Sequence, residues 1–160
     1  MDIRKGALCD LDAIAALETA CFPPAEAASR ESFQRRLSVH PECFWLMEED
    51  GQLIAAVNGC CSNERDLRDE MFSDISLHDP DGDWLMIFGV ETDPAYQHRG
   101  LAQKLLTEVI EDLRRQGRKG AVLTCKERLA GFYSLLGFVG EGRSESTHGG
   151  AVWYQMRLVF

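Results

Sequence analysis

The spacing of apolar residues predicts a helix near the start of the chain. The apolar positions that recur at helical spacing are Leu11, Ile14, Leu17 and Cys21. Asp10 precedes them and is a good helix N-cap, because its carboxylate can accept hydrogen bonds from the first free amides. Residues 22–24 read Phe-Pro-Pro, and proline lacks the amide that a continuing helix needs. We therefore expect a helix from Asp10 to about Ala20.

A second helix and a hairpin are expected next. Ser29 or Ser32 can cap a helix that ends before His40, which is followed by proline. Two short apolar runs follow at residues 43–47 and 53–57, with the turn signal Glu-Asp-Gly-Gln between them. Two such runs joined by a turn are typical of a β-hairpin.

The second half of the chain contrasts a polar stretch with strongly apolar segments. Residues 63–83 are polar and irregular, which favours a functional loop or a short helix. Residues 84–92 form the longest apolar run and predict a strand buried on both faces. From about 98 to 116 a helical stripe appears, closed by Gly117. The positions of this stripe are Leu101, Leu105, Leu106, Val109, Ile110 and Leu113.

The last segments complete the expected fold class. Apolar runs predict a strand at residues 121–125, a short helix at 129–136 and a final strand at 151–159. Strands that alternate with helices, after an initial pair of helices, indicate one mixed α/β domain over residues 1–160.

Composition and charge narrow the function classes. The chain has 26 Asp and Glu against 17 Lys and Arg, a net charge of −9, which argues against a nucleic-acid binder. No apolar run approaches the ~20 residues of a membrane helix, and we expect no signal peptide. The six cysteines show no CxxC spacing and no ligand pattern with the four histidines, so we expect no metal. Six reduced thiols suit a cytoplasmic protein.

The joint between the buried strand and the long helix is the most informative segment. Residues 92–102 read Thr-Asp-Pro-Ala-Tyr-Gln-His-Arg-Gly-Leu-Ala. Gly100 allows a tight bend and a close approach by a ligand. The amides from His98 to Ala102 then point outward at a helix N-terminus, where the dipole favours a phosphate. An ordinary strand–turn–helix joint would show the same spacing, and neither a GxxxxGK[ST] loop nor a GxSxG elbow is present.

Two motifs resemble the GNAT superfamily of N-acetyltransferases. Residues 97–102, Gln-His-Arg-Gly-Leu-Ala, resemble its Q/R-x-x-G-x-G/A signature, and residues 129–138, with Phe-Tyr-x-x-x-Gly-Phe, resemble a later helix of the fold. Within the superfamily the chain is most similar to the arylalkylamine (serotonin-type) N-acetyltransferases. The segments that carry this looser likeness are Cys125 before Tyr133, Glu64-Arg65, His40-Pro41-Glu42 and Leu77-His78.

The resemblance implies a mixed sheet in which the strand 84–92 splays from the strand 121–125, with acetyl-CoA as cosubstrate in the gap. Backbone groups of 90–92 would pair with the pantetheine arm, and the amides of 98–103 would hold the pyrophosphate. The implied cofactor-binding residues are Val90, Glu91, Thr92, Gln97, His98, Arg99, Gly100, Leu101, Ala102, Gln103 and Ser134. Tyr133 matches the tyrosine that acts as the acid toward the CoA sulfur, although a core aromatic would give the same pattern.

The proton acceptor is where the chain departs from the resemblance. Serotonin-type enzymes carry two histidines on the central strand, and the corresponding positions here are Met86 and Phe88. Neither side chain can carry a proton, so the acceptor must lie elsewhere or be bulk water. The candidates are Glu91, Glu70, His78 and Asp83.

An apolar, aromatic-lined slot is expected for the acceptor substrate, and simple core packing is the alternative for each ring. The expected substrate-binding residues are Phe22, Pro24, Met86, Phe88 and Trp153. Such a slot suits an amine with an apolar body.

The expected activity is acetyl transfer from acetyl-CoA to a small primary amine by direct attack in a ternary complex. A peptide or protein N-acetyltransferase, or a non-catalytic acyl-CoA-binding module, are the alternatives. The expected partner is a small-molecule amine, and neither a nucleic acid nor a membrane is expected. The protein is expected to be a monomer or a homodimer.

Overall fold

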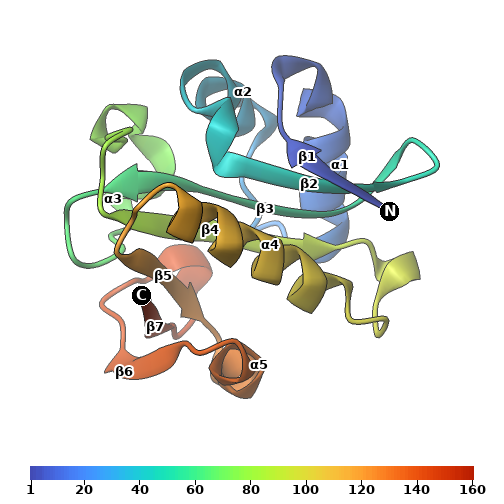
Figure 1. The fold of residues 1–160 in the computed structure, drawn as a ribbon. Helices are drawn as coiled ribbons and strands as arrows, with labels where there is room; N and C mark the ends of the chain where they lie inside the picture. The colour runs from blue at the N-terminus through green and yellow to red at the C-terminus, as the bar shows by residue number, and fades with distance from the viewer. The chain divides into compact units, whose positions relative to one another are not determined.

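The computed structural model describes all residues from 1 to 160. Its strands form one seven-stranded mixed sheet in the order β1-β2-β3-β4-β5-β7-β6. Helices connect several of these strands along the chain (Figure 1). The chain divides into two compact units. Unit 1 comprises residues 1–59 and 89–109, and unit 2 comprises residues 60–88 and 110–160. The mixed α/β class expected from the sequence is confirmed.

Unit 1 contains an antiparallel group of strands and two helices. Strand β1 (Asp2–Lys5) pairs with β2 (Phe44–Glu49), and β2 pairs with β3 (Gln52–Ser62) through the expected hairpin. Helices α1 (Leu11–Cys21) and α2 (Arg30–Val39) lie near their expected positions. Strand β1 was not expected, because three of its four residues are exposed and no apolar alternation marks it.

The starts of the two helices differ from one another. Ser29 caps α2 as expected, since its hydroxyl accepts a hydrogen bond from the Ser32 amide at 3.1 Å. The expectation that Asp10 caps α1 is wrong, because its side chain bonds to no amide of that helix. The Asp10 carboxylate instead accepts two hydrogen bonds from Arg4, at 2.7 and 2.8 Å, and one from the Ala7 amide. The Arg4 guanidinium accordingly lowers the pKa of Asp10.

The core of unit 1 lies between its helices and strands. Eight buried side chains from α1, α2, β2 and β3 form one cluster. They are Leu11, Ile14, Leu17, Phe33, Leu37, Phe44, Leu46 and Ala56. The helical periodicity of α1 and α2 therefore marks the faces that are buried.

Strand β4 (Trp84–Thr92) and helix α4 (Leu101–Arg115) begin in one unit and end in the other. Strand β4 has the bounds expected from its apolar run. Helix α4 starts at Leu101 rather than near His98, because His98 and Gly100 adopt positive φ angles of 64° and 73°. Both conformations lie outside the helical region.

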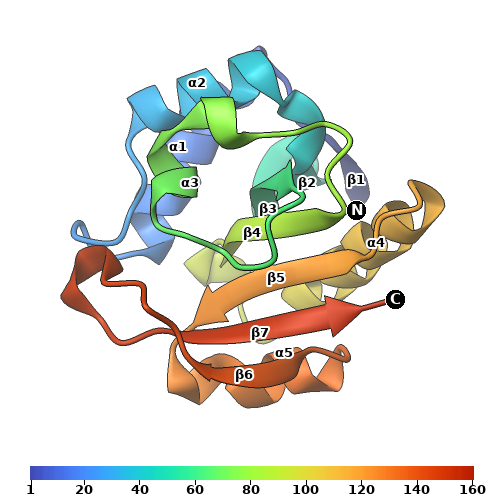
Figure 2. The ribbon, with the colours of Figure 1, turned by 90° about the vertical axis from the view of Figure 1, so that its left-hand side faces the viewer.

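Unit 2 is built around three further strands. Strand β5 (Gly120–Cys125) runs parallel to β4, from Trp84 opposite Gly120 to Ile87 opposite Leu123. Strand β7 (Tyr154–Val159) pairs antiparallel with both β5 and β6 (Val139–Arg143). Figure 2 shows these strands side by side with the short helix α5 (Ala130–Leu135).

Two parts of unit 2 differ from the expectation. The apolar pattern did not mark strand β6, because all five of its residues are exposed and two are glycine. The last strand begins at Tyr154 rather than at residue 151, because residues 151–153 belong to the preceding loop. The polar stretch 63–83 contains the short helix α3 (Glu70–Ser73) and a 3₁₀ turn at Ile75–Leu77.

The core of unit 2 collects residues from the end of β3, the polar stretch, the first part of β4 and β5. Its buried members are Cys60, Leu67, Met71, Trp84, Met86 and Val122, with Phe72, Leu77 and Phe88 packed against them. No helix in the structure has both the length and the apolar character needed to cross a membrane.

Candidate functional site

A strand–turn–helix joint in unit 1 forms the first part of the candidate site. After β4, Asp93 caps a 3₁₀ turn by accepting a hydrogen bond from the Ala95 amide at 2.9 Å. His98 and Gly100 then turn the backbone through positive φ into α4. A Cβ atom built on Gly100 meets nothing within 4 Å, so a ligand can approach the backbone there.

The charges around this joint favour an anion. The first amides of α4 have no acceptor within the helix, whose first bond runs from the Lys104 amide to the Gly100 carbonyl at 3.1 Å. No acidic side chain lies in the first turn. The Arg99 guanidinium stacks over the Tyr96 ring at 5.1 Å. The exposed ammonium of Lys104 adds a positive charge that the sequence analysis did not single out, although its place in the first turn could have shown it.

The end of β4 is held by neighbouring elements of unit 1. The Cys21 thiol donates a hydrogen bond to the Thr92 carbonyl at 3.2 Å, and the Asp93 amide donates to the Ile54 carbonyl at 2.8 Å. Burial raises the pKa of the Cys21 thiol. One of the backbone groups expected to meet a pantetheine arm, the Thr92 carbonyl, is therefore already engaged.

Glu91 is a buried carboxyl beside a second one. Its side chain is 2% exposed, neither of its oxygens meets an N–H or O–H donor, and the Glu18 carboxyl lies within hydrogen-bond reach. Only a carboxyl proton can bridge the two groups. Desolvation raises the pKa of Glu91 well above its ordinary value of 4.5, the hydrogen bond to Glu18 raises it further, and the Arg36 charge opposes the shift. Glu91 therefore keeps its proton to a higher pH than an ordinary carboxyl does, which makes it a poor base.

The same carboxyl pair is tied to the loop that follows α1. The other oxygen of Glu18, Oε2, accepts a hydrogen bond from the Ala28 amide at 2.8 Å. Arg36 on α2 donates to the Asn58 side chain at 3.1 Å. Charged and polar side chains buried in this way must be paired to be tolerated, which links α1, α2 and β3 around one polar cluster.

Tyr133 on α5, in unit 2, is the expected acid. Its side chain is 7% exposed, and its ring makes edge contacts with Phe132 and Phe138, at centroid distances of 5.1 and 5.8 Å. Burial raises the pKa of the hydroxyl, and the nearby Cys125 thiol adds to the shift. Tyr133 therefore stays protonated at neutral pH and can donate a hydrogen bond. Ser134, the next residue, is exposed.

The residues expected to bind the acceptor fall into both units. Phe22 is half-buried and Pro24 is exposed, and both follow α1 in unit 1. In unit 2, Phe88 and Trp153 are half-buried. Met86 is fully buried in the core, so its side chain offers no surface to a substrate.

A row of stacked rings in unit 2 was not foreseen from the sequence. Phe88 lies 4.5 Å from Phe72 between ring centroids, and Phe72 stacks on the imidazole of His148 at 5.5 Å with an interplanar angle of 10°. His148 in turn lies 6.1 Å from Trp153, and the Lys126 ammonium lies over that indole at 5.8 Å. We call Phe88, Phe72, His148 and Trp153 the aromatic row. All four are partly exposed, so together they present one aromatic surface.

The other expected proton acceptors are engaged in bonds of their own. Glu70 is exposed and pairs with Arg68 at 3.3 Å. Asp83 pairs with Lys119 at 3.2 Å. Nδ1 of His78 accepts a hydrogen bond from the Cys61 amide at 3.1 Å, which leaves the proton of a neutral imidazole on Nε2.

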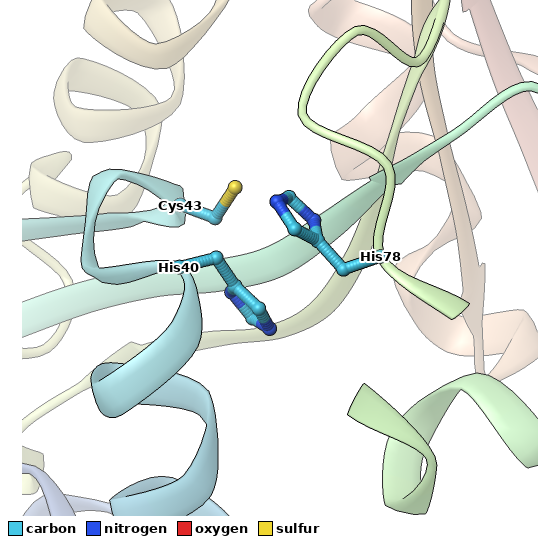
Figure 3. A group of neighbouring side chains, drawn as sticks. All are labelled: His40, Cys43 and His78. Carbon is cyan, nitrogen blue, oxygen red and sulfur yellow. The ribbon is translucent and has the colours of Figure 1, made fainter. Parts of the chain in front are cut away.

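Figure 3 labels His40 and Cys43, which belong to unit 1, and His78, which belongs to unit 2. Within unit 1, the Cys43 amide donates to the His40 carbonyl at 3.0 Å, and the buried His40 ring stacks on Phe44 at 6.4 Å. This hydrogen bond and this ring contact hold the turn that joins α2 to β2.

Unit 2 also contains an open, charged pocket of about 470 Å³. Its walls come from residues 66–70 and from 141–146 with Gln155. Beside it, the buried Arg157 guanidinium donates to Asp66 and Glu141 at 2.8 and 2.9 Å and lies over the Trp84 ring at 4.8 Å. The Arg157 charge lowers the pKa of Glu141. This network fixes β6 and β7 against the start of the polar stretch.

The mixed sheet and the glycine-containing turn before α4 are those of an α/β protein with a helix N-terminus that suits an anionic ligand. The model of the acetyltransferase (GNAT) family matches residues 11–138. The chain therefore belongs to the GNAT acetyltransferase family.

Solved structures support the fold. GphF, a GNAT-like decarboxylase in complex with isobutyryl-CoA, has a TM-score of 0.86 at 23% identity, over 99% of each chain. The ribosomal-protein-S18-alanine N-acetyltransferase of Escherichia coli has a TM-score of 0.73 at 21% identity, over 99% of this chain and 92% of the other. YncA of Salmonella typhimurium, a putative acetyltransferase with acetyl-CoA, has a TM-score of 0.70 at 20% identity, over 99% and 93%. No curated protein matches the chain.

Proposed function

We propose that the protein transfers an acetyl group from acetyl-CoA to the primary amine of a small molecule with an apolar body, such as an arylalkylamine. The strand–turn–helix joint before α4 carries this proposal. Its positive φ angles at His98 and Gly100, its unobstructed glycine and its acid-free first turn suit a pyrophosphate. Bound acetyl-CoA supplies a thioester as the acetyl donor.

The residues of this chain fit the needs of the reaction in part. The amides at the start of α4, with Arg99 and Lys104, would hold the negatively charged end of the cosubstrate. The protonated hydroxyl of Tyr133 would donate a hydrogen bond to the sulfur as it leaves. Because burial raises the pKa of Tyr133, hydrogen bonding to the thiolate contributes more than outright proton release. The aromatic row supplies the surface for an apolar amine.

Thiol release from acetyl-CoA tests the proposal with aryl, aliphatic, polyamine and peptide amines as acceptors. We expect turnover that favours arylalkylamines, and a loss of about tenfold or more for Tyr133→Phe in a folded protein. Preference for peptides would instead favour a protein or peptide acetyltransferase. Tight acetyl-CoA binding without transfer to any amine would favour a binding module. Absence of acetyl-CoA binding would overturn the proposal.

Decarboxylation of a 2-carboxyacyl-CoA is a second candidate. Neither position on β4 that should carry a base does so: Met86 is buried in the core, and Phe88 offers a half-buried apolar ring in contact with Phe72. Apolar surroundings disfavour a carboxylate in the ground state, and breaking its carbon–carbon bond passes the electron pair into the thioester as an enolate. Protonation of the α-carbon then gives the acyl-CoA. The likeness to GphF, a decarboxylase, agrees with this candidate.

One experiment separates the two reactions. Purified protein is given malonyl-CoA or methylmalonyl-CoA without any amine, and CO₂ and free thiol are both measured. A decarboxylase releases CO₂ and keeps the thioester intact, whereas an acetyltransferase with acetyl-CoA and amine releases thiol and no CO₂.

A further inference from the structure

The loop between β6 and β7 holds His148 in a fixed position. The Ser146 hydroxyl donates to the Asp69 carboxylate at 2.5 Å, and the Thr147 amide donates to its other oxygen at 3.1 Å. The Trp153 indole donates from Nε1 to the His148 carbonyl at 2.8 Å. These bonds tie the loop to the start of α3 and to its own far end, so the backbone at His148 is well defined.

The turn itself adds to this order. The Gly150 amide donates to the Thr147 carbonyl at 2.9 Å, and Gly149 and Gly150 adopt positive φ angles of 63° and 71°. Glycine is the residue that takes these angles without strain. Consecutive glycines after His148 therefore allow the tight turn that presents its imidazole.

The imidazole belongs to the same row of rings as Phe88 on β4. It stacks on Phe72 at 5.5 Å, and Phe72 lies 4.5 Å from Phe88. Phe88 occupies a strand position at which the resemblance stated above implies a proton-accepting histidine. Only one ring separates the imidazole from that position. An amine bound along the aromatic row would meet the His148 imidazole directly or through one water.

We propose that His148 is the proton acceptor for the amine, supplied from the β6–β7 loop in place of the histidines missing from β4. This proposal rests on the acetyl-transfer function proposed above. Imidazole is the side chain that most readily accepts a proton near neutral pH, whereas a primary amine with a pKa near ~10 is mostly protonated there.

The proton balance of the step is complete. The ammonium gives one proton to the imidazole, and the free nitrogen lone pair attacks the thioester carbonyl. A carbon–nitrogen bond forms and the carbon–sulfur bond breaks. The second nitrogen proton leaves with the thiolate, toward which the Tyr133 hydroxyl donates, so that the products are the amide and the thiol. The imidazolium then releases its proton to solvent.

Several charged groups lie on the elements packed against His148, and they enter any pH profile. They are Asp69 and Glu70 at the start of α3, Lys126 over Trp153, and Arg143 and Glu145 on the β6–β7 segment. Asp69 and Glu70 are bonded to the loop and to Arg68, respectively.

His148→Phe is the sharpest variant, because it keeps an aromatic ring for the stack on Phe72 and removes both nitrogens. We expect kcat/KM at neutral pH to fall about 100-fold, with a smaller change in KM. For the variant, kcat/KM should rise about tenfold per pH unit below the pKa of the amine, because only the free amine reacts. The wild-type and variant curves should converge at alkaline pH, because an amine that is already mostly free needs no proton acceptor.

Two further measurements guard against a folding artefact. Glu111→Gln, a change at an exposed carboxyl on α4, should leave the kinetics unchanged. Added imidazole should restore part of the activity of His148→Ala. Equal neutral-pH activity of wild type and His148→Phe, or parallel pH profiles, would overturn the assignment while leaving acetyl transfer intact. A wild-type protein without turnover on any amine would overturn the proposed function itself.

Discussion

The buried carboxyl pair of Glu18 and Glu91 makes stability depend on pH in a way that one substitution can isolate. Desolvation raises the pKa of Glu91 well above 4.5, so the folded protein holds a proton that the unfolded chain releases once the pH exceeds about 4.5. The contribution of Glu91 is therefore fully present below that pH. It is lost as the pH rises toward the raised pKa of the folded state.

The magnitude follows from proton linkage. For each pH unit between 4.5 and the raised pKa, the free energy of unfolding falls by about 1.4 kcal/mol because of this one group. Glu91→Gln removes the slope, since an amide needs no proton to donate a hydrogen bond to Glu18. Above pH ~5 the variant should therefore become progressively more stable than wild type, by roughly 1 kcal/mol for each pH unit below the raised pKa. Near pH ~4.5 the two should agree within about 1 kcal/mol.

Urea unfolding over this pH range measures the effect. Tryptophan fluorescence reports on both units, since Trp45 lies in unit 1 and Trp84 and Trp153 lie in unit 2. Coincident fluorescence and far-UV circular dichroism curves justify a two-state analysis. Glu111→Gln, an exposed carboxyl on α4, is the control and should run parallel to wild type. If Glu91→Gln also runs parallel to wild type, the proton shared by the carboxyl pair does not exist.

Three other substitutions test the anion site and the local structure. Gly100→Ala should destabilise the fold by about 1–2 kcal/mol, because φ is +73° there. The substitution should also weaken acetyl-CoA binding measured by calorimetry, and unchanged affinity would contradict a close ligand approach. Lys104→Gln should weaken acetyl-CoA binding a few-fold at low salt and little at high salt, and equal loss at both would exclude a charge effect. Ser29→Ala should cost about 1 kcal/mol of stability in urea through the lost helix cap, with acetyl-CoA affinity as the unchanged control.

The parts of the fold that the sequence predicted share a buried apolar pattern. Strand β4 and the stripe of α4 are strongly apolar on the faces that the core covers, so their periodicity was readable. Strands β1 and β6 are mostly or wholly exposed, and no pattern marks them. Asp10 shows a different limit: its residue type suits a helix cap, but Arg4, brought close by β1, competes for the same carboxylate. That competition depends on strand pairing.

One part of the candidate site could be predicted from the sequence, and the other part could not. The glycine-containing joint before α4 is local in sequence, so its turn could be predicted from residues 97–102 alone. The aromatic row is not local, because it joins α3, β4 and the β6–β7 loop. His148 stands alone among polar residues, and Phe72 lies in a stretch without periodicity. Neither signal identifies a site until the fold brings the rings together.

The place of the proton acceptor has a consequence for substrate choice. A base on β4 would put a polar group in a strand whose neighbours are buried, and burial would favour the neutral imidazole. On the β6–β7 loop the imidazole is half-buried and lies against one face of Phe72, which leaves Phe88 and Trp153 as apolar surface on either side. Phe72→Ala should therefore raise KM for aryl amines more than for short aliphatic amines, since it removes the ring between His148 and Phe88. An equal effect on both classes would show that the row only packs the fold.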